Sequence, residues 1–296
     1  MLWSSTKIQL KVMRKRKEFI YALLAMTGYA CAAFLYVLVK CRGMDVSVMK
    51  DANQNVCYSP MNGMWNFFSI LYPFLVVIPF ATSYIDDYRN RLLAIYFSRS
   101  SRQVYYFSKV LAAWIGTALV IAIPCTLNLA LCNIFLPHNH NTWLGEYQLE
   151  NFYRAVTGTN HLYETNDRGI FLIRLFLRSP LLYNIVYLFI FSLFSGLLGA
   201  FVLSLSFWIR KKKMVLFLPV FIIMYALDTI NIKWLYMAID GKKPYMDTAV
   251  LDYVTPSFSS GGMNPAFIGI VIMMLSGFII LSTVHAIGED LAGIQS

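Results

Sequence analysis

Long apolar runs alternate with short polar intervals along this chain. Six of the runs approach or exceed the roughly 18 residues that mark a helix able to cross a bilayer. We therefore predict an all-α polytopic membrane protein with six transmembrane helices. These helices are expected over residues 19–39, 65–85, 110–136, 180–209, 214–237 and 266–287, with residues 1–18 before them and a tail over 288–296.

Serine and proline residues refine these helices. Ser179 followed by Pro180 has the form of an N-cap and first helical residue, so the fourth transmembrane helix should begin there. Proline lacks a backbone N–H and clashes with the preceding turn, so Pro73 and Pro79 should kink the second helix and Pro124 the third.

The N-terminal segment 1–18 carries six Lys and Arg residues interleaved with apolar ones. This pattern predicts an interfacial helix on the cytoplasmic leaflet, with its basic side facing lipid phosphates. A positively charged, partly disordered topology signal is the alternative. No small-residue cleavage site precedes the first apolar run, so we do not expect a cleaved signal peptide.

The interval 86–109 is basic and rich in helix-forming residues, but its apolar residues are too few to cross a bilayer. Asp86 and Asp87 stand where the N-cap of a short helix would lie. Ser100 with Gln103 has the form of a capping box that would start a second helix. We predict a helical hairpin here, exposed at the surface where another protein could bind and displace it.

Composition supports a membrane location. The chain is 58% hydrophobic and 14% charged, whereas a soluble domain averages about 25% charged residues. The net charge of +10 does not indicate nucleic-acid binding, because most of the Lys and Arg residues flank apolar runs in short segments. The positive-inside rule then places both termini and the hairpin in the cytoplasm and 137–179 in an outer loop. The absence of an N-x-[ST] sequon fits a bacterial cytoplasmic membrane.

The sequence contains no motif for nucleotide binding or hydrolysis. G-x-x-x-x-G-K-[ST], H-E-x-x-H and G-x-S-x-G are all absent, so we expect no enzyme and no bound cofactor. His138 and His140 would need further ligands to hold a metal, and a solvated loop is the preferred interpretation. Cys41 and Cys57 share the first outer loop, so they are either paired in a disulfide or free.

Asp228 is the one acid well inside a predicted transmembrane helix, and Asn231 shares its helix face. An acid at this depth is a functional-site candidate. The plainer alternatives are a polar contact between helices or a pair with Lys233. Ser195 and Gly199 have the small-residue spacing that lets helices approach closely, within one bundle or between copies.

Residues 91–109 read RLLAIYFSRSSRQVYYFSK. Together with the N-terminal basic helix and the six spans, this stretch resembles the ABC-2 type permeases, the membrane subunits of bacterial ABC exporters. The motif similarity is confined to about 86–109, whereas the topology matches along the whole chain. The chain departs from the family where Arg91 replaces a Gly four residues after the acidic Asp87.

The resemblance implies a type V exporter-like fold in which the hairpin is a cytoplasmic coupling helix docked on a separate ATPase. It implies two ATPase copies, which bind ATP and Mg, and a second permease subunit that is identical or paralogous. Membrane lipids would surround the complex, and no nucleic acid is implied. The coupling residues carried over are Asp87, Arg89, Arg91, Leu92, Tyr96, Phe97, Arg99 and Arg102.

The substrate expected from this resemblance and from the aromatic-rich spans is apolar or amphipathic: a peptide, an antibiotic or a lipid. Two other functions stay open. One is an ion-coupled secondary carrier that uses Asp228, and the other is a scaffold or sensor subunit that transports nothing.

Overall fold

The computed structural model describes residues 2–46, 49–138, 172, 175, 178–209, 213–239, 248–256 and 265–295. These residues form helices and turns, with no strand among them. Most of the predicted outer loop 137–179, including His140, lies outside the described residues.

Four helices are long and apolar enough to cross a membrane, which indicates a multi-pass membrane protein. They are α2 (Lys17–Cys41), α6 (Arg102–Phe135), α9 (Pro180–Trp208) and α12 (Pro265–Gln295). Two shorter apolar helices, α3 (Trp65–Val77) and α10 (Phe217–Ile239), occupy the other two predicted positions. The helix α12 continues to Gln295, so most of the expected tail over 288–296 is helical.

The predicted second helix over 65–85 is wrong as a single element. The helix α3 ends at Val77, the chain turns over 78–82, and α4 (Ser83–Arg89) begins a new helix. Pro73 is accommodated inside α3, whereas Pro79 lies in the turn. Each of these two prolines, six residues apart, removes a backbone hydrogen bond, and the helix ends just before the second of them.

The N-terminal helix α1 (Leu2–Arg14) forms as predicted. It buries Thr6, Gln9 and Met13, while Trp3 and Ile8 are exposed. The side chain of Met13 fills the space beside Gly116 of α6, where a β-carbon would overlap the thioether. This helix is therefore packed against the bundle by one face and leaves apolar side chains on the other.

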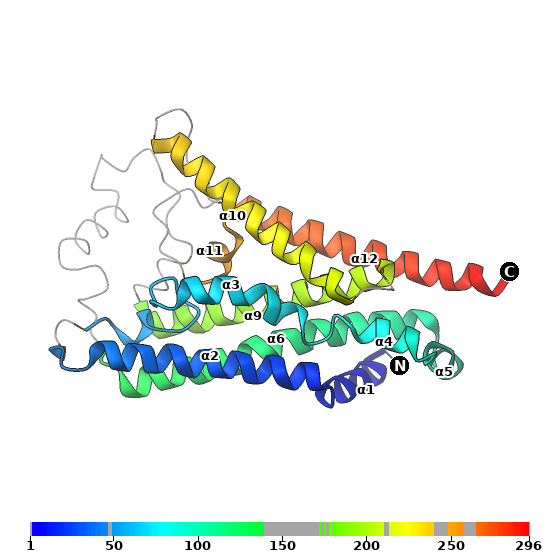
Figure 1. Ribbon diagram of the computed structural model, residues 1–296, viewed down its shortest axis with the longest axis horizontal. Helices are drawn as coiled ribbons and strands as arrows, with labels where there is room; N and C mark the ends of the chain where they lie inside the picture. Colours follow the sequence, from blue (N-terminus) through cyan, green and yellow to red (C-terminus); the bar gives the residue numbers. More distant parts are fainter. Residues whose placement is uncertain are drawn as a thin grey trace.

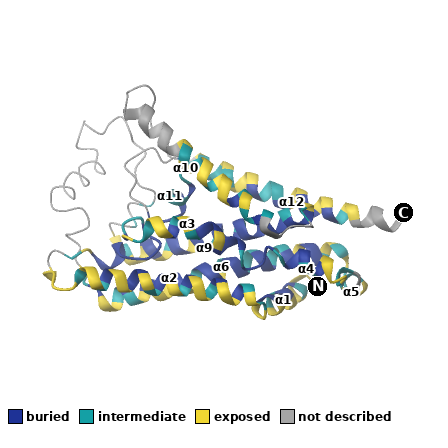
Figure 2. Ribbon diagram, in the orientation of Figure 1, coloured by how far each residue is buried: buried dark blue, intermediate teal, exposed yellow. Residues whose placement is uncertain are grey.

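The core of the protein is the contact between α6 and α9, along which buried residues concentrate (Figure 2). The helix α9 begins at Pro180 with the Ser179 hydroxyl accepting the Leu182 N–H, as the sequence predicts. A β-carbon added at Gly196 would lie 2.5 Å from the Trp114 carbonyl oxygen. The small residues of α9 thus let it approach α6 within one chain.

Gly196→Ala should lower the free energy of unfolding by about 1–3 kcal/mol, because the new methyl group meets a backbone atom that cannot rotate away. Gly28→Ala is the matched control, since a β-carbon at Gly28 of α2 has no heavy atom within 4 Å. Unfolding of the purified chain in mixed detergent micelles measures both. An equal loss of stability in the two variants would contradict the close α6–α9 contact.

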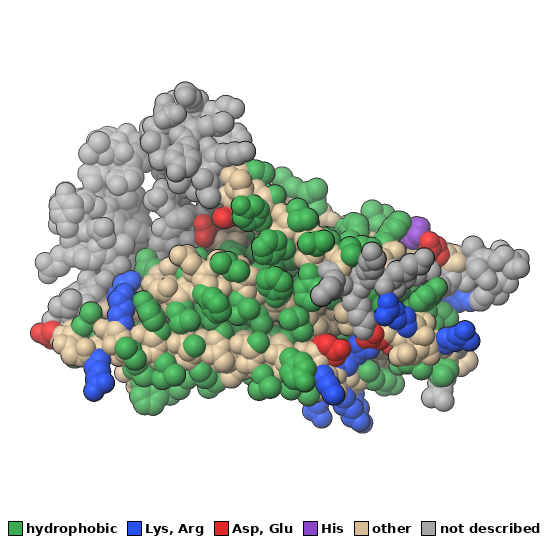
Figure 3. Space-filling model, in the orientation of Figure 1, with side chains coloured by type: hydrophobic (Ala, Val, Ile, Leu, Met, Phe, Trp, Pro, Cys, Tyr) green, Lys and Arg blue, Asp and Glu red, His purple; other side chains and the backbone are tan. Residues whose placement is uncertain are grey.

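The two ends of the molecule differ in what they carry. Figure 1 places α1, α4 and α5 (Leu93–Arg99) at one end together with both chain termini. The loop between α2 and α3 lies at the other end. Lys and Arg side chains lie towards these two ends, with a mostly hydrophobic surface between them (Figure 3).

Candidate functional site

The predicted hairpin is present and joins α3 to α6. It consists of α4, a turn over residues 90–92, and α5, which ends where α6 begins. The Leu92 N–H donates to the Asp87 carbonyl at 2.9 Å and closes the turn. Arg91 has φ +55°, the left-handed conformation that glycine adopts most readily. Arg91 is also the position at which the resembled family has Gly.

Two details of the hairpin prediction are wrong. Asp86 and Asp87 lie inside α4 rather than at an N-cap, because that helix already begins at Ser83. The N-cap of α6 is Ser101 rather than Ser100, and its hydroxyl accepts the Val104 N–H. Ser100 instead ends α5 by donating its hydroxyl to the Tyr96 carbonyl at 3.1 Å.

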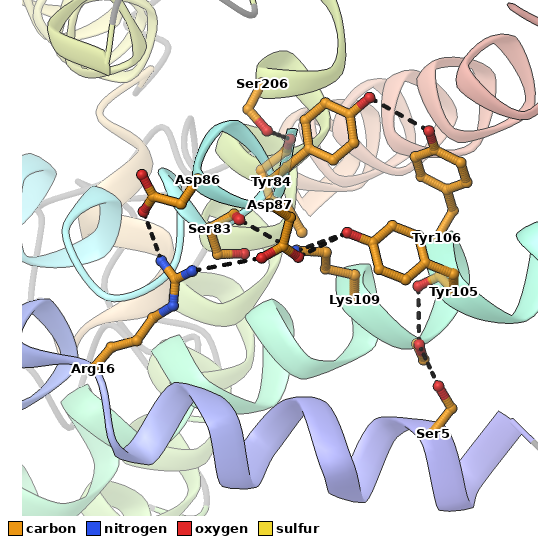
Figure 4. Close-up of polar contacts among 12 residues, drawn as sticks. Ser5, Arg16, Ser83, Tyr84, Asp86, Asp87, Tyr105, Tyr106, Lys109 and Ser206 are labelled. Carbon is orange, nitrogen blue, oxygen red and sulfur yellow. Dashed lines mark hydrogen bonds and ion pairs between the residues drawn. The ribbon is translucent and has the colours of Figure 1, made fainter. Parts of the chain in front are cut away.

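A buried charged cluster anchors the hairpin to α6 (Figure 4). The Asp87 carboxylate of α4 accepts hydrogen bonds from Lys109 Nζ and from the Tyr105 hydroxyl, the latter at 2.8 Å. Lys109 also donates to the Ser83 carbonyl at 3.2 Å. Lys109 is 1% exposed and Asp87 is 5% exposed, so both charges depend on each other for compensation.

A second basic residue ties the same cluster to the start of α2. Arg16 Nη1 lies 3.0 Å from Asp86 Oδ2, and its Nη2 lies 3.9 Å from Asp87 Oδ1. Arg16 is the N-cap residue of α2, between α1 and α2. We call Arg16, Asp86, Asp87 and Lys109 the charged cluster. It joins three segments that are distant in sequence: the α1–α2 junction, α4 and α6.

The inner face of α5 packs against α6 through aromatic rings. The ring centroids of Tyr96 and Phe97 lie 5.2 Å and 5.5 Å from that of Tyr105. Burial raises the pKa of the Tyr96 phenol, and the nearby Asp87 carboxylate adds to the effect. The Arg102 guanidinium lies over Phe97 at 5.4 Å. The inner face of α5 is therefore fixed to the first turn of α6.

The outer face of α5 is open. Ile95 is 52% exposed, and Arg89 at the end of α4 and Arg91 in the turn before α5 are exposed as well. Among the described residues, Arg102 Nη1 is buried and has no hydrogen-bond partner. Leu92 is partly buried, and the side chain of Arg99 lies outside the described part of the chain. This face combines an apolar side chain with basic neighbours.

Sequence reasoning named Asp87 but missed its partners, Lys109 and Arg16, as members of the site. One signal was available: Lys109 directly precedes an apolar run, and it follows Tyr105 by one helical turn. A lysine in that position becomes buried as soon as the helix packs, and it then requires an acid.

The first predicted outer loop folds back into the protein. Residues 51–59 and Asn62 are almost entirely buried, and we call 51–62 the buried loop. Asn128 of α6 holds it: the Cys57 N–H donates to Asn128 Oδ1 at 2.8 Å, and Asn128 Nδ2 donates to the Ala30 carbonyl at 2.8 Å. From α9, Asn184 Nδ2 donates to the Asn53 carbonyl at 2.8 Å.

Cys41 and Cys57 do not form a disulfide, because both are free thiols. The sulfur of Cys57 lies 3.9 Å from that of Cys125 on α6 instead. The buried loop carries Cys57 inwards, away from the exposed end of α2 where Cys41 lies. Of the two alternatives left open by the sequence the structure has free thiols, because Cys41 ends α2 while the fold of residues 51–62 buries Cys57.

Asp228 lies on the exposed side of α10 and lines a cavity together with Asp252 of α11 (Val250–Val254). The structure therefore places Asp228 away from the hairpin. The side chains of Asn231 and Lys233 lie outside the described part of the chain, so their predicted relation to Asp228 stays a prediction.

Searches of protein-family models, curated proteins and solved structures found no match to this chain.

Proposed function

We propose that this chain is the permease subunit of an ATP-driven exporter, with α5 as the element that docks on a separate ATPase. The observation that carries the proposal is the buried Asp87–Lys109 pair, which fastens α4 to α6, the longest of the described helices, and so anchors the hairpin that carries α5. A helix held in this way transmits a displacement to α6, whereas a loosely tethered loop would absorb it.

The exposed face of α5 supports a protein partner. Ile95 offers an apolar contact, and Arg91, exposed in the turn before α5, offers positive charge. Such a surface fits an acidic groove with an apolar floor. In this proposal ATP and Mg bind only to the partner, because the chain has no nucleotide-binding motif.

The proposed topology has six crossings, with α3 and α10 completing the four long helices. The hairpin end then faces the cytoplasm with both termini, and the buried loop faces outwards. Two such permease subunits, identical or paralogous, would work with two ATPases in a bacterial cytoplasmic membrane. Movement of α5 reaches α6 through the packing of Tyr96 and Phe97 on Tyr105. Movement of α4 reaches α6 through the charged cluster and reaches α3 through the turn over 78–82.

Ile95→Asp should abolish retention of the ATPase and ATP-driven transport, because it places a negative charge in the apolar contact. Ile8→Asp is the control, since Ile8 of α1 is 59% exposed and lies outside the hairpin. The tagged chain is purified from its native host, and bound protein with a Walker A motif and ATPase activity is measured.

The double variant Tyr96→Ala, Arg99→Ala should uncouple ATP hydrolysis by the partner from transport by this chain.

An ATPase that stays bound to the Ile95→Asp variant would rule out docking through α5. Failure of the unaltered chain to retain any ATPase would instead favour an ion-coupled carrier. The cavity beside Asp228 is the observation that supports this second candidate. In that case uptake or release of substrate would follow a proton or sodium gradient, and Asp228→Asn would abolish the dependence.

A further inference from the structure

Two cysteine sulfurs meet where the buried loop contacts α6. The Cys57 thiol of the loop donates to the Cys125 sulfur at 3.9 Å. Both side chains are 0% exposed. The two positions are 68 residues apart in sequence, so a bond between them would join the segment between α2 and α3 to α6.

The backbone of Cys57 is held on both sides of its α-carbon. Its N–H donates to Asn128 Oδ1 at 2.8 Å, and its carbonyl oxygen accepts the Tyr29 hydroxyl at 2.8 Å. Cys125 lies on the same helix as Asn128, three residues earlier. The contacts that close the buried loop therefore also hold the two sulfurs together, which raises their effective concentration towards each other.

A disulfide would require the two sulfurs to approach to about 2.0 Å. Rotation about the Cα–Cβ bonds moves the sulfurs towards each other and leaves the held backbone in place. Two buried cysteines can also pack simply as small apolar side chains. Packing alone requires no preference between these two thiols, so the bond that forms on oxidation separates the two roles.

Cys132 provides a matched comparison on the same helix. It follows Cys125 by two helical turns, about 10 Å along the axis of α6. It is also 0% exposed, and its sulfur lies 3.7 Å from the Asn55 carbonyl oxygen of the buried loop. Cys132 thus shares the helix, the burial and the loop with Cys125, but it lies against a different residue of that loop.

We propose that Cys57 and Cys125 form a reversible disulfide on exposure to a small hydroperoxide, and that this bond locks the buried loop against α6. In the topology proposed above the loop faces outwards, on the side of a bacterial membrane where disulfides persist. The bond itself is independent of the permease function, because both sulfurs belong to this chain.

The reaction begins when the buried loop opens locally. Burial raises the pKa of the Cys57 thiol, so the closed loop keeps this sulfur protonated and protected. In the open loop the Cys57 thiolate attacks one oxygen of hydrogen peroxide, and the O–O bond breaks. The leaving hydroxide takes up a proton to give water, and Cys57 becomes a sulfenic acid.

The second step occurs when the loop closes again. The Cys125 sulfur attacks the Cys57 sulfenic sulfur, the S–S bond forms, and the S–O bond breaks to release a second water. The two thiols have then lost two electrons and two protons, and the peroxide has been reduced to two waters.

The test exposes the purified full-length chain in detergent to hydrogen peroxide and then blocks the remaining thiols. Digestion without reduction, followed by mass spectrometry, should show a peptide pair joined through Cys57 and Cys125 as the main cross-link. Cys125→Ala should abolish this pair, whereas Cys132→Ala should leave it unchanged. A chain unfolded in sodium dodecyl sulfate before oxidation should pair its five cysteines without this preference.

Amide hydrogen exchange measures the lock on the loop. Oxidation should slow the exchange of residues 51–62 about tenfold, because the bond removes the open states through which they exchange. Dithiothreitol should restore the original rate, whereas it does not reverse oxidation of methionine. Oxidised Cys132→Ala should show the same slowing, and oxidised Cys125→Ala should not.

Absence of the Cys57–Cys125 peptide pair from the oxidised folded chain, or a Cys57–Cys132 pair in its place, would overturn the proposal. Unchanged exchange of residues 51–62 in the bonded chain would do the same. A chain that forms the bond but retains no ATPase would preserve the disulfide and remove the permease function. A chain that retains an ATPase through α5 but forms no such bond would do the reverse.

Discussion

Asp87→Asn is expected to lower the free energy of unfolding by about 3–5 kcal/mol, the largest effect of any single substitution considered. The amide keeps the shape of the carboxylate but leaves the Lys109 ammonium buried without its compensating charge. Unfolding of the purified chain in mixed micelles measures the loss. If the proposed permease function holds, ATP-driven transport should fall with it, because α4 and the hairpin lose their attachment to α6.

A double-mutant cycle tests the cause. Lys109→Met in the Asp87→Asn background removes the unpaired charge and should recover much of the lost stability. Asp86→Asn is the matched control: its contact with Arg16 is partly exposed, so its cost should stay below about 1 kcal/mol. Equal losses for Asp86→Asn and Asp87→Asn would contradict the distinct role assigned to the buried pair.

Asn128→Leu is expected to cost about 2–4 kcal/mol, because it orphans one buried amide and removes a second hydrogen bond. The Cys57 N–H of the buried loop loses its acceptor, and the Ala30 carbonyl of α2 loses a donor. We expect the loop to loosen, so cysteine-directed labelling of Cys57 in the folded protein should become faster as well.

Asn133→Leu on the same helix is the control for this substitution. Among the described residues Asn133 Nδ2 donates to the Leu129 carbonyl one turn earlier, so its removal should cost about 1 kcal/mol or less. Fast labelling in the Asn133 variant, or slow labelling in the Asn128 variant, would show that Asn128 does not hold the buried loop closed.

Much of the fold follows from local patterns. The start of α9 depends on Ser179 and Pro180 alone, and both the N-terminal helix and the short helix α5 follow from residues within one or two turns. The start of α9 is decided by a capping residue, whereas α1 and α5 follow from the local alternation of helix-forming polar and apolar residues, which a single sequence displays directly.

The features that sequence reasoning missed depend on distant partners. The polar residues 51–62 have the composition of a solvated loop, yet they are buried because Asn128 and Asn184 supply their hydrogen bonds from two other helices. Likewise, Asp87 is a plausible N-cap by local sequence, and only the packing of α4 on α6 reveals its pairing with Lys109. The six-helix count and the coupling role stay predictions.

The continuity of α6 has a mechanical consequence. It is one helix of 34 residues, and its Trp114 and Thr117 lie directly against Gly196 and Gly199 of α9. At 1.5 Å per residue, Lys109 lies about 10 Å from Gly116 on one side, and Asn128 lies about 18 Å from it on the other. If α6 turned as one body about that contact, its two ends would move in opposite directions, and the Asn128 end would move further than the Lys109 end. Pro124 lies within this longer arm, so bending at the proline would reduce the movement that reaches the buried loop.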